Sequence, residues 1–427
     1  IVMFRIKRLF SKKQGICVLA LLTAGLFSAC AGEQEKIEID PVEVITVDEE
    51  EDGKEAVSDA NDGAQTGVSP EETGNGAVDS ETEEKEKTSA IEALKEQYGE
   101  DCLTDQIFEF ELTVNGEKVM FVPHWSQSDG TFYMQIIRNG EVLSEWSGYV
   151  PDALQGKTFV SLDAVSFFDV NFDGITDIVM VETYGDKTFA AVYFGDSFMA
   201  EMCDWYFQEK RGLSERLTES LDEVTISGIR NLLSGGKKNG EFSCYQEAYE
   251  AVIAQRELEN PGPTEYSKGM QYDLIDFDGD DIPELAAGIN GYYMSLYTYS
   301  EGSVYALMYD WGYGAMGNAG YEYSPGKNSL RNYNADYAGL VMYLTYMTIG
   351  QQHSLEQVVQ IVIYNFDDVN GNGMPDEAEQ DSFGEYGVNK IDGRVVTEEE
   401  CGVYDVGGYE YIEGSMSADE LLEKLKQ

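Results

Sequence analysis

The segment that decides the fold is Phe168-Asp169-Val170-Asn171-Phe172-Asp173-Gly174-Ile175-Thr176-Asp177-Ile178-Val179. Counted from Asp169, oxygen-bearing side chains stand at positions 1, 3, 5 and 9, and a glycine stands at position 6, where the chain must turn sharply. One tight loop with this spacing supplies most of the six to eight oxygen ligands that Ca²⁺ takes. We name residues 169–177 loop 1, with the predicted ligands Asp169, Asn171, Asp173, the backbone carbonyl of Ile175, and Asp177.

Two later segments repeat this spacing. Loop 2 (276–284) offers Asp276, Asp278, Asp280, Ile282 through its carbonyl, and Glu284. Loop 3 (368–379) offers Asp368, Asn370, Asn372, Met374 through its carbonyl, Asp376, and Glu379 at position 12. Loop 2 has four carboxylates and is expected to bind most tightly, provided that Asp281 adopts the left-handed turn at position 6. Loop 3 is expected to be the weakest unless Glu379 reaches the ion. Metal-free Asx turns are the alternative, but they do not explain why the same positions recur.

Loops 1 and 2 run directly into strand-like residues and resemble the integrin-type (FG-GAP or VCBS) calcium repeat. Loop 3 continues into Glu377-Ala378-Glu379, a helical sequence, and is more similar to an EF-hand or dockerin loop. The resemblance implies calcium as the cofactor. Loops 1 and 2 lie about 107 residues apart, so a complete propeller of that family is not expected.

The rest of the folded chain indicates an α+β, β-dominated protein. Strand-like runs at 107–114, 119–122, 131–137 and 142–146 are separated by turn sequences such as Asn139-Gly140, which favours a hairpin. We therefore expect an antiparallel meander domain followed by a mixed helix and hairpin domain. Helices are expected at 89–98, 225–233, 242–258 and 354–364, and from Ser417 onward.

The N-terminal segment resembles an export signal. Five basic residues precede the apolar run 16–27, which is too short to span a bilayer. The following Ser28-Ala29-Cys30 resembles a bacterial lipobox, and the resemblance implies that Cys30 is lipidated; a secreted protein without lipid is the alternative. The segment 31–88 contains no Phe, Tyr or Trp and is rich in acidic residues, which is typical of a disordered tether. Such a protein would be anchored by lipid on the outer face of a bacterial membrane.

The charge of the chain restricts its partners. The 427 residues include 80 Asp and Glu against 28 Lys and Arg, for a net charge of −52. A nucleic-acid partner is excluded, because phosphate binding needs a basic surface. Residues 91–427 still hold 60 acidic against 19 basic residues, which points to cations and to a basic protein as partners.

Catalytic patterns are absent from the sequence. His124 and His353 stand alone, and there is no nucleophile elbow, zincin motif or phosphate-binding loop. A glycosidase-type carboxylate pair leaves no sequence signature and stays open. Cys102, Cys203, Cys244 and Cys401 allow three disulfide pairings, none of which the spacing selects.

The segment 292–346 holds 13 Tyr and a Gly-rich run. Exposed aromatic residues on such loops stack on sugars or anchor protein partners, whereas buried ones fill β-cores. If a surface for a glycan or protein exists here, the expected residues are Trp311, Tyr313, Tyr321, Tyr323 and Tyr333.

These features predict four regions: a lipoprotein signal peptide (1–30), an acidic tether (31–88), a β-rich domain with loop 1 (89–212) and an α+β domain with loops 2 and 3 (213–427). This layout resembles that of Gram-positive surface lipoproteins with no assigned activity. The leading hypothesis is a calcium-binding, membrane-anchored binding or adhesion module without catalysis. The alternatives are an inhibitor or immunity-type protein directed against a cell-wall hydrolase, a solute-binding lipoprotein, and a glycan-active enzyme.

Overall fold

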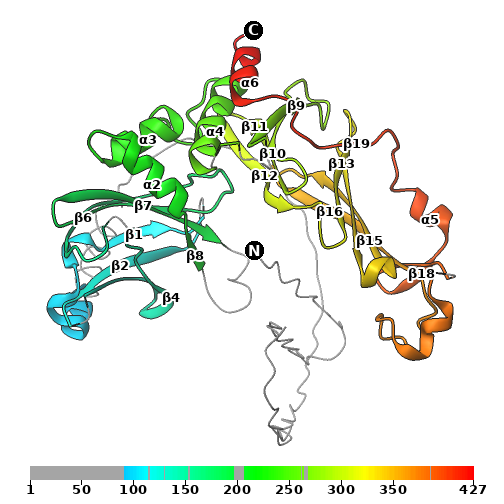
Figure 1. Cartoon of the computed structure of the whole chain (residues 1–427), viewed down its shortest axis with the longest axis horizontal. Coiled ribbons are helices and arrows are strands. Elements are labelled where there is room, and N and C mark those ends of the chain that lie inside the picture. Colours follow the sequence, from blue (N-terminus) through cyan, green and yellow to red (C-terminus); the bar gives the residue numbers. More distant parts are fainter. Residues whose placement is uncertain are drawn as a thin grey trace, which may run out of the picture. The chain divides into compact units, whose positions relative to one another are not determined.

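The computed structural model describes residues 91–113, 116–128, 130–151, 154–196, 206–260, 262–263, 268–384 and 386–427. The signal sequence with Cys30, the tether and Cys203 lie outside these residues. Strands predominate, and all the strand pairs in the sheets are antiparallel, which confirms the β-dominated α+β fold (Figure 1). A short helix at 91–98 and two 3₁₀ turns, Gly99–Asp101 and Thr104–Gln106, lead into the first sheet.

The first sheet is the predicted meander. Its strands follow one another in sequence order: β1 (Phe108–Glu111), β2 (Lys118–Ser126), β3 (Thr131–Arg138) and β4 (Glu141–Ser147). Between β3 and β4, Asn139 and Gly140 have φ values of 52° and 84°. Two consecutive left-handed residues are what a two-residue hairpin turn requires, so the Asn-Gly pair sets this connection as predicted.

The second sheet is also a four-stranded meander, formed by β5 (Phe159–Phe168), β6 (Asp177–Tyr184), β7 (Lys187–Asp196) and β8 (Tyr206–Glu209). Because side chains alternate along a strand, Ile178 and Met180 of β6 join a core with the first sheet, while Val179 and Val181 face α2 (Arg211–Ser220) and α3 (Ile226–Ser234). Figure 1 shows these two helices beside this sheet. The predicted domain boundary at 212/213 therefore falls inside a helix that packs on β7.

The third sheet repeats this order with β9 (Gln271–Ile275), β10 (Glu284–Ile289), β11 (Tyr293–Ser300) and β12 (Ser303–Gly312). One of its faces packs against α4 (Tyr245–Glu259) and α6 (Ala418–Leu425). The other face packs against aromatic residues of the fourth sheet. Ser417 caps α6 with Glu420 in the capping box that the sequence predicts.

The fourth sheet has seven strands in the order β18-β17-β16-β15-β14-β13-β19. Their bounds are β13 (Asn318–Ser324), β14 (Ser329–Asp336), β15 (Val341–Ile349), β16 (Leu355–Tyr364), β17 (Val388–Ile391), β18 (Arg394–Val396) and β19 (Glu410–Tyr411). The short elements Tyr337–Gly339, Glu377–Ser382 and α5 (Glu398–Gly402) lie in its connections. The helix expected at 354–364 is wrong: this segment is β16, because its β-branched residues pair along the whole of β15.

Candidate metal centres

Loop 1 connects β5 to β6. Phe168, the last residue of β5, pairs with Asp177, the first residue of β6, so that ligand position 9 opens a strand. Two backbone groups hold the Asp177 carboxylate: the N–H of Val170 donates to Oδ2 at 2.7 Å, and the N–H of Gly195, on β7, donates to Oδ1 at 2.9 Å. The backbone of the loop itself and the strand β7 thereby fix this carboxylate.

The other ligand positions of loop 1 are ordered by the loop itself. Asp169 accepts the N–H groups of Asp173 and Gly174 at 3.1 and 2.9 Å. Asn171 Oδ1 accepts the N–H of Asp173 at 3.2 Å, and Asp173 Oδ1 accepts the N–H of Ile175 at 2.9 Å. The predicted side chains at positions 1, 3 and 5 therefore fold over one short backbone segment.

Burial makes negative charge on the carboxyl groups of loop 1 unfavourable when no cation is bound. Asp177 is fully buried, and burial, with Asp173 and Asp169 adding repulsion, raises its pKa well above the usual value. Burial likewise raises the pKa of Asp169 to about 8, with Asp173 contributing, and that of Asp173 to about 6. A bound cation would reverse both effects by stabilising the ionised forms. A set of carboxylate, amide and carbonyl oxygens fits a hard divalent cation.

Loop 2 is built in the same way between β9 and β10. Ile275 pairs with Glu284, which opens β10 as Asp177 opens β6. Glu284 Oε2 accepts the N–H of Phe277 at 2.9 Å, and Oε1 accepts the Thr298 hydroxyl at 3.1 Å. Thr298 lies on the third strand of its sheet, as Gly195 does, so position 9 has equivalent supports in both loops.

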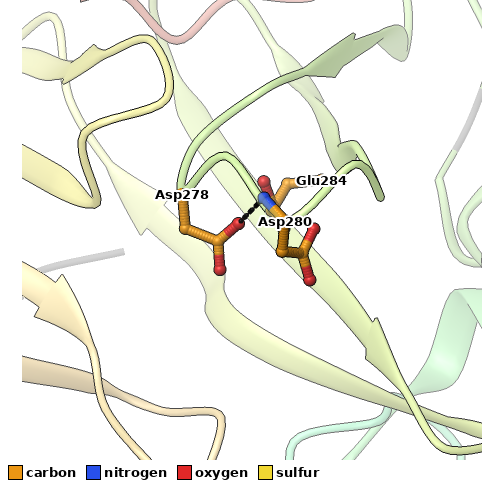
Figure 2. Close-up of side chains that lie close together, drawn as sticks. All are labelled: Asp278, Asp280 and Glu284. Carbon is orange, nitrogen blue, oxygen red and sulfur yellow. Dashed lines mark hydrogen bonds between the residues drawn. The ribbon is translucent and has the colours of Figure 1, made fainter.

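The carboxylates of loop 2 converge. Figure 2 shows Asp278 and Asp280 in the loop beside Glu284, and one oxygen from each lies within 4.8 Å of the others. Burial, with the nearby charges of Asp278 and Asp280 contributing, raises the pKa of Glu284 to about 8. Asp276 is not in this group of three; its Oδ1 accepts the N–H of Gly279 at 3.0 Å. Three carboxylates at this spacing are able to hold a metal ion.

All three loops share one backbone pattern. Positions 4 and 6 are left-handed in each, with φ between 64° and 82°: Phe172 and Gly174, Gly279 and Asp281, Gly371 and Gly373. In each loop the N–H of position 5 donates to the side-chain oxygen of position 3, and the N–H of position 7 donates to that of position 5. Asp281, at 70°, adopts the turn that the sequence required of it.

Loop 3 differs at its end. Asp376, position 9, caps the turn Glu377–Ser382 by accepting the N–H of Ala378 at 2.8 Å. Glu379, position 12, is buried, and its Oε1 accepts the N–H of Val369 at 2.8 Å. Glu379 therefore takes the place that Asp177 and Glu284 hold in the other loops. Glu379 therefore reaches back into loop 3, where its Oε1 accepts the N–H of Val369.

Loops 1 and 2 each contact a neighbouring sheet. The carbonyl of Phe172 accepts the N–H of Ala306, on β12, at 2.7 Å, and the Phe172 ring packs against Phe242. In loop 2, the carbonyls of Asp276 and Phe277 each accept a backbone N–H, at 2.9 Å, from the turn between β13 and β14. Each loop thus stands where its own sheet meets the next sheet along the chain.

The aromatic residues named for a possible ligand surface pack into cores of the protein. Tyr313, Tyr321 and Tyr323 are buried in the core between the third and fourth sheets, and Trp311 packs against the same core. Tyr333 packs against a separate core of the fourth sheet. The burial of these tyrosines favours the alternative that they fill a β-core, and argues against a stacking surface at Tyr313, Tyr321 and Tyr323.

Several supporting residues were not found from the sequence. Gly195 and Thr298 lie on strands remote from the loop spacing, and no local signal marks them. Of the cysteines, Cys102, Cys244 and Cys401 are free thiols in the structure. His124 is buried and bonds to Gln135 at 3.0 Å, in agreement with a structural role.

No protein-family model matches this chain, and no curated protein matches it as a relative. Within the described residues, the helices are too short or too polar to cross a membrane. The case for function therefore depends on the geometry of the three loops.

Proposed function

We propose that this chain is a calcium-binding, non-catalytic surface module in which bound ions hold neighbouring β-sheets together. One observation carries the proposal: loops 1 and 2 occur at the same place in two sheets of equal topology, with the same backbone conformation and the same supports for position 9. Calcium suits these loops because it accepts flexible sets of carboxylate and carbonyl oxygens.

The position of the loops gives the ion a mechanical role. Loop 1 also reaches the first sheet, because the N–H of Thr176 donates to the carbonyl of Leu112 at 2.9 Å. An ion that orders loop 1 would therefore fix contacts to the sheets on both sides. Loop 2 would do the same for the third and fourth sheets. The contacts between neighbouring sheets would then be rigid only where calcium is abundant, as it is outside cells.

The remaining parts of the proposal concern location and partners. Lipidation at Cys30 and the acidic tether would hold the module at the outer face of a bacterial membrane. A surface glycan or a basic protein is the proposed partner class, and the excess of acidic residues in 91–427 favours the basic protein.

Calcium titration of the full chain tests the proposal. We expect isothermal calorimetry to detect at least two sites, and the melting temperature to rise with calcium and fall in EDTA. A site held at 100 times its Kd contributes about 2.7 kcal/mol to the free energy of unfolding. An unchanged melting temperature in EDTA, together with no heat of calcium binding, would refute the proposal.

A pair of variants localises the effect. Asp278→Ala removes one of the three converging carboxylates of loop 2 and should abolish one calcium site. Asp222→Ala removes an exposed carboxylate outside all three loops and should leave the number of sites unchanged. If both variants bind calcium like the parent protein, loop 2 is not a metal site.

A further inference from the structure

Lys390 places a positive charge inside loop 3. Its Nζ lies 3.4 Å from Oδ2 of Asp368, the first ligand position of the loop. The ammonium also stands over the ring of Tyr364, 4.4 Å from the centroid. The Asp368 side chain is only 6% exposed and that of Lys390 is 25% exposed, so the contact is largely shielded from water. This ion pair is therefore screened less than one on the surface.

Loops 1 and 2 have no ion pair of this kind, although the charge of Lys210 acts on Asp173 and opposes the rise of its pKa. Among the described residues, no basic side chain lies within 4.0 Å of a ligand carboxylate of either loop. Loop 3 also carries neutral Asn370 and Asn372 where the other loops carry more carboxylates. It has the least negative charge at positions 1, 3 and 5 of the three loops, and part of that charge is already balanced.

We propose that Lys390 is a tethered competitor for calcium at loop 3, so that the ammonium and the ion occupy Asp368 alternately. This inference rests on the proposed calcium-binding function and assigns its regulation. A calcium ion lies about 2.3–2.6 Å from its ligand oxygens. An ion on Asp368 would therefore stand within a few ångströms of Nζ, and the repulsion between the two charges would expel the ammonium.

The competition has a graded consequence. Loops 1 and 2 fill at low calcium and order the sheet junctions, whereas loop 3 fills only when the concentration is high enough to displace Lys390. Lys390 lies on β17, where it pairs with Val362 of β16. Filling loop 3 therefore frees a positively charged side chain from the fourth sheet, and exposes it to solvent.

The test is calcium titration by isothermal calorimetry of the full chain and of Lys390→Met, which keeps the aliphatic stem over Tyr364 and removes the charge. We expect the parent protein to show two strong sites and one weaker site. In Lys390→Met the weak site should strengthen by at least about tenfold, because a cation no longer opposes the ion. Asp368→Asn in the Lys390→Met background should remove that strengthened site and so assign it to loop 3.

Two controls accompany this variant. Lys390→Arg keeps the charge and should retain the weak site. Lys157→Met removes the same charge from an ion pair with Asp186, away from all three loops, and should leave every affinity unchanged. Three equal sites in the parent, or a third site that does not respond to Lys390→Met, would overturn the inference while the proposed function stands. No calcium uptake by any variant would overturn both.

Chemical labelling gives an independent readout. The rate at which an amine-acylating reagent modifies Lys390, followed by peptide mass spectrometry, should rise several-fold between EDTA and saturating calcium. Lys157 serves as the internal reference. A constant rate at Lys390 in a protein that has bound three calcium ions would show that the ammonium does not leave, and would contradict the inference.

Discussion

Replacing Arg256 by Met should lower the free energy of unfolding by about 3–5 kcal/mol. Arg256 lies on α4, is fully buried, and pairs through Nη1 with Glu259 at 2.8 Å and through Nη2 with Asp310 on β12. Methionine fills a similar volume but leaves two carboxylates without their main cation. The loss of stability comes more from burying these two carboxylates without Arg256 than from losing their attraction to it.

The neighbours of Arg256 explain why its replacement would weaken contacts between several elements. Glu259 also pairs with Lys210 at 3.3 Å, just before α2, and accepts the Tyr309 hydroxyl. Burial alone would raise the pKa of Glu259, but Arg256 and Lys210 together hold it below the usual value. The network therefore connects α2, α4 and β12, and removal of its central cation loosens all three contacts.

Chemical denaturation in buffer with fixed calcium measures this effect. Arg394→Met is the matched control, because Arg394 also pairs with a glutamate, Glu400, at 2.9 Å, but both side chains are exposed. This variant should cost no more than about 0.5–1 kcal/mol. If Arg256→Met costs as little as Arg394→Met, the buried network does not hold the helices to the third sheet.

The features that were predicted correctly from the sequence are local ones. The ligands of loops 1 and 2 lie within nine residues, so their spacing alone encodes the turn, and Asp281 was correctly expected to be left-handed. Asn139-Gly140 is another local signal. In contrast, Phe172 is left-handed at φ 64° without a glycine or a short polar side chain. Its burial against Phe242 stabilises that conformation, and this contact joins residues 70 apart.

The errors also have a physical origin. Short apolar runs such as 354–364 fit either a helix or a strand, and only the pairing with β15 decides between them. The exposure of Trp311 and its tyrosine neighbours depends on which sheets close over them, which no residue spacing reveals. Lys390 contacts Asp368 from a strand 22 residues further along the chain, so no local sequence pattern could predict this contact.

The second large effect is expected for Glu284→Gln, whose effect on stability should change sign between EDTA and calcium. Glu284→Gln should stabilise the protein in EDTA by roughly 2–4 kcal/mol at neutral pH and destabilise it relative to the parent in saturating calcium. The hydrogen bonds survive the substitution, because Gln can accept the N–H of Phe277 and donate to the Thr298 hydroxyl. What changes is the charge: a buried carboxylate beside Asp278 and Asp280 is unfavourable without a cation and is a ligand with one.

Glu182→Gln is the control that separates the effect of calcium binding at Glu284 from the effect of burying a glutamate. Glu182 is fully buried on β6, outside the three loops, and burial raises its pKa to about 8, whereas Tyr184 donates a hydrogen bond to it. Since the folded pKa exceeds the unfolded value of about 4.5, the parent loses stability as pH rises from about 4.5 to 8, and the loss is on the order of 3 kcal/mol by pH 7.

Glu182→Gln should remove that loss equally with calcium and with EDTA. Thermal melts of both variants from pH 5 to 8 measure it. A calcium-dependent effect at Glu182, or the same sign of effect in both buffers at Glu284, would contradict the assignment of Glu284 as a metal ligand.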